Sequence, residues 1–175
     1  WMPDVFERFF ADFGKKPLDY YELDKLDPGY QVVFEGGETI EIGDSLDKIY
    51  KIFDQEEKNG AQKLKKFIDN ARKNYDIAIK DLVYKPGVSA LELVTPKTIS
   101  KLGEFFSTVD NDVEKEFTNE KLKQILKFPV LFLGAKPSET PSFYSFMNYA
   151  DFGLGTWHPK GGFHEVIAAM VSLAK

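Results

Sequence analysis

The stretch from Asp151 to Gly162, DFGLGTWHPKGG, holds four glycines and a proline within twelve residues and constrains the fold more than any other part of the sequence. Its side chains alternate as in a β-strand, with Phe152, Leu154 and Thr156 on one side and Gly153, Gly155 and Trp157 on the other. Two glycines on one strand face leave bare backbone that a flat group can approach closely. On pattern alone, the same bare face also fits a strand crossed tightly by another element. Pro159 and the Gly161-Gly162 pair then turn the chain into a final helix.

Two runs in this region carry a family resemblance. Residues 140–147 read TPSFYSFM, and residues 154–162 read LGTWHPKGG. Together they resemble the TP..YS.M.YAD...GTWYP.GG segment of the phytoene (carotenoid) desaturase family of FAD-dependent oxidoreductases, in which this segment leads into a helix that returns to the flavin domain. The chain departs from the family at His158, where Tyr is usual, and at Phe163, where Met is usual.

The resemblance implies a site that borders a flavin ring and a polyene. The cofactor-binding candidates are Gly153, Gly155, Trp157, Pro159, Gly161 and Gly162. The substrate-binding candidates are the aromatic and thioether side chains of one short helical segment, namely Phe143, Tyr144, Phe146, Met147 and Tyr149. Such side chains can line an elongated apolar slot without fixed polar demands, and any one of them fits a packed core equally well.

Few residues offer conventional catalytic chemistry. His158 and His164 are the only histidines, and the sequence lacks cysteine, so we expect no metal site. His158 adjoins the proposed glycine shelf and is a weak candidate for a general base, although the family's usual Tyr argues against essential imidazole chemistry. The chain has no G-x-G-x-x-G motif, P-loop or nucleophile elbow. We therefore expect FAD to belong to a full-length parent, and the isolated piece to be inactive and without tightly bound FAD.

Composition excludes several functional classes. The 175 residues carry a net charge of −5 without a basic cluster, so nucleic acid is not an expected partner. The absence of cysteine excludes disulfides and thiol catalysis and is typical of a cytoplasmic protein. No run reaches the roughly 18 apolar residues of a membrane-spanning helix. The 16 Phe side chains need a core, an apolar cavity or an apolar partner, so a peripheral membrane contact stays open.

In the rest of the sequence, the spacing of apolar residues is mostly typical of helices. The spacing of apolar residues predicts helices over residues 4–13, 46–53, 61–82, 95–117 and 118–126, with a break at 110–112 and a cap at Thr118. The Phe-rich face of the first helix fits either burial in the core or contact with a membrane surface. Residues 28–44 predict a hairpin with a two-residue turn at Gly36-Gly37, and its first strand, apolar on both sides, is expected to belong to a larger sheet.

These observations predict an α+β protein with an antiparallel or mixed sheet covered by several helices. Both ends lie in apolar helical patterns, so we expect one domain, residues 1–175, cut from a longer chain. The resemblance implies the substrate domain of an amine-oxidase-like flavoprotein, with a long isoprenoid substrate and the flavin-binding domain of the same parent as partners. Two alternatives remain: a related flavin oxidoreductase, such as a retinol saturase or an amine-oxidase-like enzyme, and a non-catalytic lipid-binding or interaction module.

Overall fold

The computed structural model describes residues 2–85, 96–99 and 101–175, which divide into two compact units. Unit 1 comprises Trp1–Ser45 and Leu154–Lys175, and unit 2 comprises Leu46–Gly153. The described residues form helices in both units and short antiparallel strands in unit 1, so the predicted α+β class is confirmed. A single substrate-binding domain over residues 1–175 stays a prediction.

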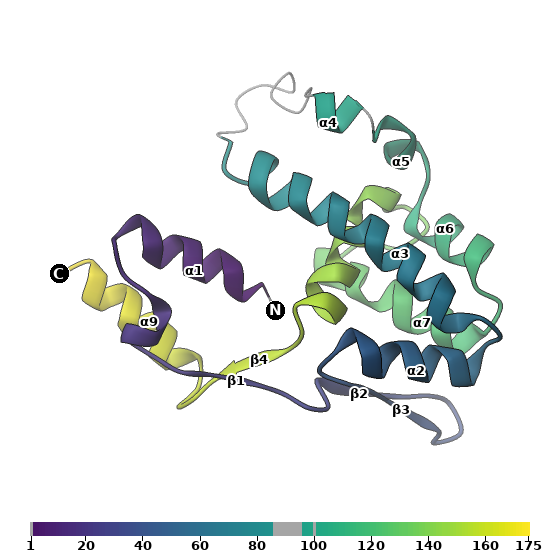
Figure 1. Cartoon of the computed structure of the whole chain (residues 1–175), viewed down its shortest axis with the longest axis horizontal. Coiled ribbons are helices and arrows are strands. Elements are labelled where there is room, and N and C mark those ends of the chain that lie inside the picture. The colour runs from purple at the N-terminus through teal and green to yellow at the C-terminus, as the bar shows by residue number, and fades with distance from the viewer. Residues whose placement is uncertain (1, 86–95, 100) are drawn as a thin grey trace. The chain divides into compact units, whose positions relative to one another are not determined.

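Unit 1 is built around two helices that lie side by side (Figure 1). Its elements are α1 (Pro3–Asp12), η1 (Pro17–Asp19), β1 (Leu23–Lys25), β2 (Tyr30–Val33), β3 (Thr39–Ile42), β4 (Trp157–Pro159) and α9 (Phe163–Leu173). The buried centre consists of Phe10 from α1, Tyr21, and Val166 and Ala169 from α9. Phe163 and Ile167 of α9 do not belong to this buried centre and are 67% and 58% exposed.

The two sheets of unit 1 are smaller than predicted. β1 pairs antiparallel with β4, with Lys25 opposite Trp157, and β2 pairs antiparallel with β3. The hairpin at residues 28–44 is confirmed, but within the described residues it forms a sheet of its own and Val33 is 66% exposed. Its turn is also longer than two residues, because the ladder closes with the Phe34 N–H donating to the Glu38 carbonyl at 2.8 Å.

The strand predicted from Asp151 is wrong over most of its length. Residues Tyr149–Gly153 form a π-helical segment, η6, and β4 begins only at Trp157. The physical reason is the burial of Phe152, which is 1% exposed and packs edge-on against Phe53 with ring centroids 6.4 Å apart. Because the short alternating run is also compatible with helix, tertiary packing decides its conformation.

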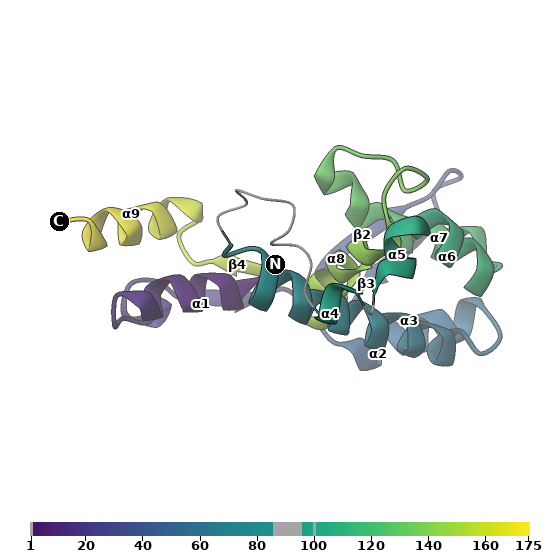
Figure 2. The same ribbon diagram turned by 90° about the horizontal axis from the view of Figure 1, so that it is seen from above.

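Unit 2 is helical. Its elements are α2 (Leu46–Glu56), α3 (Gly60–Tyr75), η2 (Asp76–Leu82), α4 (Pro96–Ile99), α5 (Leu102–Phe106), α6 (Val109–Glu116), α7 (Glu120–Lys127), η4 (Phe128–Leu133), η5 (Ser142–Ser145), α8 (Phe146–Asn148) and η6. α2 runs alongside α3 (Figure 2), and their interface buries Phe53, Leu64 and Ile68 almost completely. The fully buried Phe117 and Leu122 continue this core toward α7.

The observed helix bounds and caps agree only in part with those predicted from the sequence. The helix expected over residues 61–82 is confirmed as α3 followed by η2, while Pro86 and Gly87, expected to stop it, lie outside the described residues. The next helical stretch breaks before Thr108, whose hydroxyl caps α6 by accepting from the Asn111 N–H at 3.2 Å. The break predicted at residues 110–112 is therefore wrong. Asn119, not Thr118, caps α7, with its side chain accepting from the Lys121 N–H at 2.9 Å.

Candidate functional site

The β4–α9 corner keeps the sharp turn that its proline and glycines predict. Gly161 and Gly162 have φ angles of +81° and +93°, a region that side chains with a Cβ rarely adopt. Lys160 ties the corner to the chain before β1, because its N–H donates to the Glu22 carbonyl at 2.9 Å and its ammonium pairs with the Glu22 carboxylate at 2.5 Å. The hydrogen bond that the Lys160 ammonium donates to the Glu22 carboxylate raises the pKa of Lys160.

An apolar pocket of about 400 Å³ opens beside this corner, and we name it the corner pocket. It lies within unit 1 and is lined by Pro3, Phe6, Tyr21, Leu23, Leu26, Thr156, Trp157, His158, Pro159, Phe163 and Val166. Two of the predicted cofactor-binding residues, Trp157 and Pro159, are thus brought together with the weak catalytic candidate His158. The pocket's size falls within the range of roughly 300–1,000 Å³ that is usual for small-molecule sites.

Trp157 is held in one orientation in the wall of this pocket. Its indole Nε1–H donates to the Leu154 carbonyl at 2.8 Å. On the ring face, the Lys25 ammonium lies 5.5 Å from the centroid, within the range of a cation–π contact. The polar edge of the indole is therefore satisfied by the chain itself, and its apolar surface stays available to the pocket.

A second apolar pocket, of about 490 Å³, adjoins the first, and we name it the α1 pocket. Both pockets share Pro3, Tyr21, Leu23 and Trp157 in their walls. The α1 pocket continues along the helix to Glu7, Ala11, Lys15, Lys16, Pro17 and Leu18. The two pockets therefore adjoin each other at these four residues, and we call them together the apolar depression of unit 1.

The bare shelf predicted at Gly153 and Gly155 is wrong. A Cβ at Gly153 would lie 2.5 Å from the ring of Tyr149, and one at Gly155 would lie 2.6 Å from the Lys25 Cε. The chain's own side chains therefore fill the space that a flat ring was expected to use. Gly162 differs, because a Cβ there would meet no atom within 4 Å. Cofactor binding by the glycines stays a prediction that depends on the family resemblance.

The two histidines are both exposed. His158 meets the ring of Phe163 edge-on, with centroids 6.1 Å apart, at the border of the corner pocket. No group of three His, Asp or Glu side chains suited to a metal ion occurs in residues 2–85, 96–99 and 101–175. In the same residues no helix is both long enough and apolar enough to cross a bilayer.

The predicted substrate-binding residues belong to unit 2 and have an inverted burial pattern. Ser145 and Asn148 are 4% and 0% exposed, whereas the neighbouring aromatic and thioether side chains Tyr144, Phe146, Met147 and Tyr149 are only half-buried. Phe143 is the exception: it is 4% exposed and stacks on Phe105 at 4.9 Å. Phe143 therefore contributes to the core, Phe146 packs against the same cluster, Tyr149 meets the Tyr75 ring edge-on at 5.4 Å, and all four of these neighbouring side chains stay partly exposed.

Hydrogen bonds explain how the polar side of this segment is buried. The Asn74 amide of α3 donates to Ser145 Oγ at 3.3 Å and to the Glu104 carboxylate at 2.5 Å, and the Asn148 amide donates to the Leu126 carbonyl at 2.8 Å. Glu104 also pairs with Lys101 at 2.6 Å. This network orients the segment against α3, and periodicity alone cannot reveal it because its members lie up to 71 residues apart.

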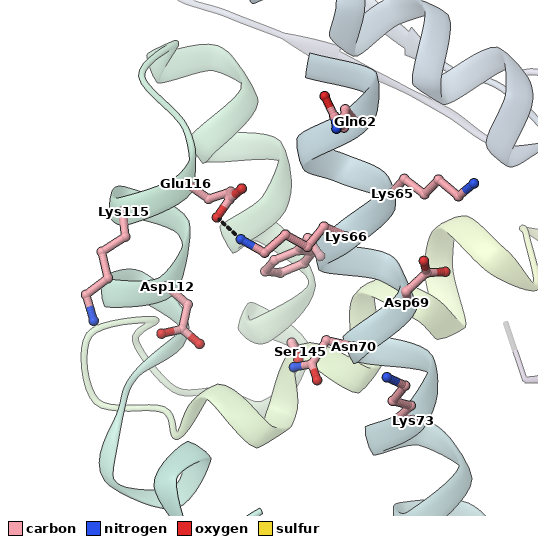
Figure 3. A pocket seen from close by; sticks show the side chains of 11 residues that line it. Gln62, Lys65, Lys66, Asp69, Asn70, Lys73, Asp112, Lys115, Glu116 and Ser145 are labelled. Carbon is pink, nitrogen blue, oxygen red and sulfur yellow. Dashed lines mark hydrogen bonds and ion pairs between the residues drawn. The ribbon is translucent and has the colours of Figure 1, made fainter. Parts of the chain in front are cut away.

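Sequence reasoning missed a polar groove between α3 and α6 in unit 2, with a volume of about 660 Å³ (Figure 3). Its walls carry Gln62, Lys65, Lys66, Phe67, Asp69, Asn70, Lys73, Asp112, Lys115, Glu116 and Ser145. Lys66 reaches across it to Glu116 at 3.0 Å. The lysines of α3 in this groove lie beside Asp69, Asp112 and Glu116, and these mixed charges give no reason to assign it a ligand.

The known proteins that this chain resembles all carry names of carotenoid-modifying enzymes. No family model matches the chain. Over 99% of its length it is 34% identical to a carotenoid 3,4-desaturase of Haloarcula japonica, 25% identical to a zeta-carotene-forming phytoene desaturase of Myxococcus xanthus and 24% identical to a 4,4'-diapolycopene oxygenase of a Methylomonas species. The chain spans 36%, 34% and 35% of these proteins, about a third of each.

Proposed function

The chain belongs to the phytoene desaturase family, and on that premise we propose that it is the substrate-binding part of a flavoprotein that dehydrogenates a long isoprenoid or carotenoid precursor. In this proposal unit 1 and unit 2 together correspond to the substrate domain of an amine-oxidase-like fold. The flavin-binding domain of the same parent chain is the proposed partner.

The observation that carries this proposal is the apolar depression of unit 1. Its walls are mainly aromatic, aliphatic and proline side chains, Trp157 is shared by both pockets, and the charged residues Glu7, Lys15 and Lys16 belong to the α1 pocket. The indole N–H is already bonded to the Leu154 carbonyl, so Trp157 makes no polar demand on a ligand. A hydrocarbon chain, which has no polar group to satisfy, suits such a surface because its burial releases water from apolar area on both sides.

The outward-facing residues of unit 2 support the same substrate class. Burying Ser145 and Asn148 while half-exposing Phe146 and Met147 reverses the usual partition of side chains. A helix with this pattern gains stability when an apolar ligand or partner covers its aromatic side. Met147 adds an adaptable thioether surface, which suits a long and flexible ligand.

We propose that FAD of the parent lies beside the β4–α9 corner, because the surroundings of Gly153 and Gly155 are occupied by the chain's own side chains. Gly162 leaves its surroundings open, and the first turn of α9 presents N–H groups without intrahelical acceptors, which favour a negative charge. At Gly153 and Gly155 the space is filled by Tyr149 and Lys25. When bound to the parent, FAD would accept the hydride lost from a saturated C–C bond of the substrate.

The residues of this chain would act by binding and by excluding water. Trp157 and Pro159 would hold the hydrocarbon against the corner, and Tyr21 and Leu23 would continue that contact into the α1 pocket. Enclosure of the reacting carbons by apolar walls would keep water away from the site of hydride loss. No side chain of the corner pocket is assigned as a base.

A non-catalytic lipid-binding module is the second candidate, because unit 1 supplies both pockets without help from another chain. The two candidates differ in what a purified full-length protein carries. A desaturase retains flavin absorbance and converts phytoene, whereas a carrier retains a lipid and has neither property.

Substitution of Trp157 tests the proposal in the full-length protein. Trp157→Ala should abolish most conversion of phytoene, and Trp157→Phe, which keeps an aromatic ring beside Lys25, should restore much of the activity with an unfolding transition close to wild type. A Val33→Ser variant, in the exposed hairpin of the same unit, is the matched control and should behave as wild type. Full activity of Trp157→Ala, or a full-length protein without flavin, would contradict the proposal.

A further inference from the structure

Tyr21 is a buried phenol in the wall that the corner pocket and the α1 pocket share. It is 6% exposed and belongs to the buried centre of unit 1, where its ring meets Phe10 edge-on with ring centroids 5.9 Å apart. Its backbone N–H donates to the Pro17 carbonyl at 3.0 Å. Because the phenol oxygen lies on the axis of a ring that is packed in this way, its position is fixed and only the hydroxyl hydrogen can rotate.

The hydroxyl of Tyr21 has no hydrogen-bond partner among residues 2–85, 96–99 and 101–175. Its oxygen is also not one of the unpartnered polar atoms that are sealed from solvent, so the small accessible part of this side chain includes the oxygen. Since Tyr21 lines both pockets, the oxygen opens onto the apolar depression. Phenylalanine would fill the same space in the core, so packing alone does not require the hydroxyl.

The other polar side chains of the depression are either bonded within the chain or exposed. The Trp157 Nε1–H donates to the Leu154 carbonyl, and Thr156 has a partner of its own. The exposed ones, which water hydrates at the rim, are Glu7, Lys15, Lys16 and His158. Among the described residues that line the depression, Tyr21 is therefore the buried side chain with an unused hydrogen bond.

The Tyr21 hydroxyl acts as a hydrogen-bond donor at neutral pH. Burial raises the pKa of the phenol above its ordinary value of 10.0, so the group stays protonated. Without a ligand, water in the pocket can accept the hydrogen bond. A hydrocarbon that displaces this water leaves the hydroxyl unpaired in apolar surroundings, which weakens binding by about fivefold to a hundredfold, whereas an oxygen atom on the ligand avoids that loss.

We infer that the Tyr21 hydroxyl donates a hydrogen bond to an oxygen atom of the ligand, so that the apolar depression selects long isoprenoids that carry such an oxygen over the hydrocarbons that lack it. The apolar walls hold the isoprenoid chain, and the phenol fixes where its oxygen lies. Tyr21 is thereby a specificity-determining residue. The isoprenoid class rests on the proposed function, whereas the hydrogen bond rests on the pocket itself.

Binding of three ligands of equal chain length to the full-length protein tests this selection. They are geranylgeraniol, its methyl ether, whose oxygen accepts but cannot donate, and the hydrocarbon in which hydrogen replaces the hydroxyl group. In isothermal titration in dilute detergent, wild-type protein should bind both oxygen-bearing ligands at least about tenfold more tightly than the hydrocarbon. Equal affinities, expected if Tyr21 serves only a bound water or the core, would overturn the inference, as would a methyl ether that binds like the hydrocarbon.

Two tyrosine variants assign the preference to one hydroxyl. Tyr21→Phe keeps the ring and removes the oxygen, so the affinities for geranylgeraniol and its ether should fall to within about twofold of that for the hydrocarbon. Tyr20→Phe is the matched control and should keep the wild-type preference, because Tyr20 also packs against Phe10, with ring centroids 5.3 Å apart, but lines neither pocket. A preference that survives in Tyr21→Phe, or one that is lost equally in Tyr20→Phe, would contradict the assignment.

Turnover separates this inference from the proposed function. Titration needs no catalysis, so the preference can be measured even if the full-length protein carries no flavin and does not convert phytoene, an outcome that would contradict the proposed function alone. Conversion of phytoene by a protein that binds the three ligands equally would instead contradict the hydrogen bond of Tyr21 and leave the proposed function standing.

Discussion

Lys25 lies over the ring of Trp157, with its Nζ 5.5 Å from the ring centroid, and the same side chain occupies the space beside Gly155. The two residues face each other because β1 and β4 pair in this register. One lysine therefore both orients the largest wall of the corner pocket and closes the predicted glycine shelf. The strand pair, only three residues long on each side, gains its specificity from this side-chain contact.

Gly155→Ala should lower the free energy of unfolding by about 1–2 kcal/mol, because its φ of +80° is unfavourable for a residue with a Cβ. The contact with the Lys25 Cε adds little, since the end of a lysine side chain can move away. Urea denaturation of Gly155→Ala, Lys25→Ala and the double variant checks this. If the double variant were as stable as Lys25→Ala alone, the destabilisation by Gly155→Ala would come from the contact with the Lys25 side chain and not from the backbone conformation.

Glu57 should make the stability of unit 2 depend on pH in the acid range. Burial raises the pKa of Glu57, but hydrogen bonds from Lys63 and from the backbone N–H groups of Asn119 and Thr118 outweigh it and hold the pKa below its ordinary value of 4.5. The stabilisation is therefore complete above about pH 4.5 and is lost as the pH falls through the lower pKa of the folded state. Glu57→Gln should lose about 2 kcal/mol at pH 7, where its charge-assisted hydrogen bonds are weakened.

Chemical denaturation between pH 3 and 7 measures this effect. The difference in unfolding free energy between wild type and Glu57→Gln should shrink as the pH falls below 4.5. A difference that stays constant down to pH 3, or grows, would contradict the assignment. Glu38→Gln, which replaces an exposed carboxylate of the hairpin, is a suitable control for general charge effects.

Gly60 and Gly103 should respond to alanine in opposite directions. A Cβ at Gly60 would lie 1.9 Å from the Phe53 carbonyl oxygen, so Gly60→Ala forces the α2–α3 turn apart and should cost about 3 kcal/mol or more. At Gly103 a Cβ meets nothing within 4 Å, and alanine in this helical position should stabilise by about 0.5–1 kcal/mol. Thermal unfolding of the two variants against wild type checks both signs.

The fold could be predicted from sequence wherever one local pattern decides the structure. The three- and four-residue spacing from Leu64 to Leu82 predicts α3 and η2, and Gly36-Gly37 predicts the hairpin. β1 could not be predicted, because Leu23–Lys25 has no alternation and its partner lies more than 130 residues later. The N-cap of α7 was assigned to Thr118, one residue too early, because Thr and Asn are both suitable N-caps and sequence alone does not distinguish the two neighbours.

The candidate site also combines residues with a local sequence signal and residues that only long-range contacts bring to it. Trp157 and Pro159, predicted from the family resemblance to bind the cofactor, lie in the wall of the corner pocket, and their binding role stays a prediction. The remaining walls, Tyr21 and Leu23, come from the other end of the chain and carry no signal of their own. Gly155 was misinterpreted because the occupant of its open side, Lys25, depends on the strand register and not on any neighbouring residue.

His158→Tyr in the full-length protein should leave turnover nearly unchanged. The imidazole is exposed at the border of the corner pocket, and its described contact is the edge of Phe163 at 6.1 Å. Tyrosine preserves an aromatic edge there and is the residue that the family usually carries. Steady-state conversion of phytoene provides the measurement, and a loss of about a hundredfold, the size expected on removing a general base, would assign the proton transfer to His158.

Variants of Phe143 and Met147 should distinguish a role in core packing from a role in substrate binding in residues 143–149. Phe143 is 4% exposed and stacks on Phe105, so Phe143→Ala should cost about 3–5 kcal/mol of unfolding free energy. Met147 is half-buried, so Met147→Ala should cost only about 1 kcal/mol while lowering kcat/KM for the apolar substrate in the full-length protein. Met147 belongs to the core if Met147→Ala lowers the unfolding free energy as much as Phe143→Ala does and the folded variant converts substrate normally. The partly exposed side chains of Tyr144, Phe146 and Tyr149 would then have an apolar partner other than the substrate.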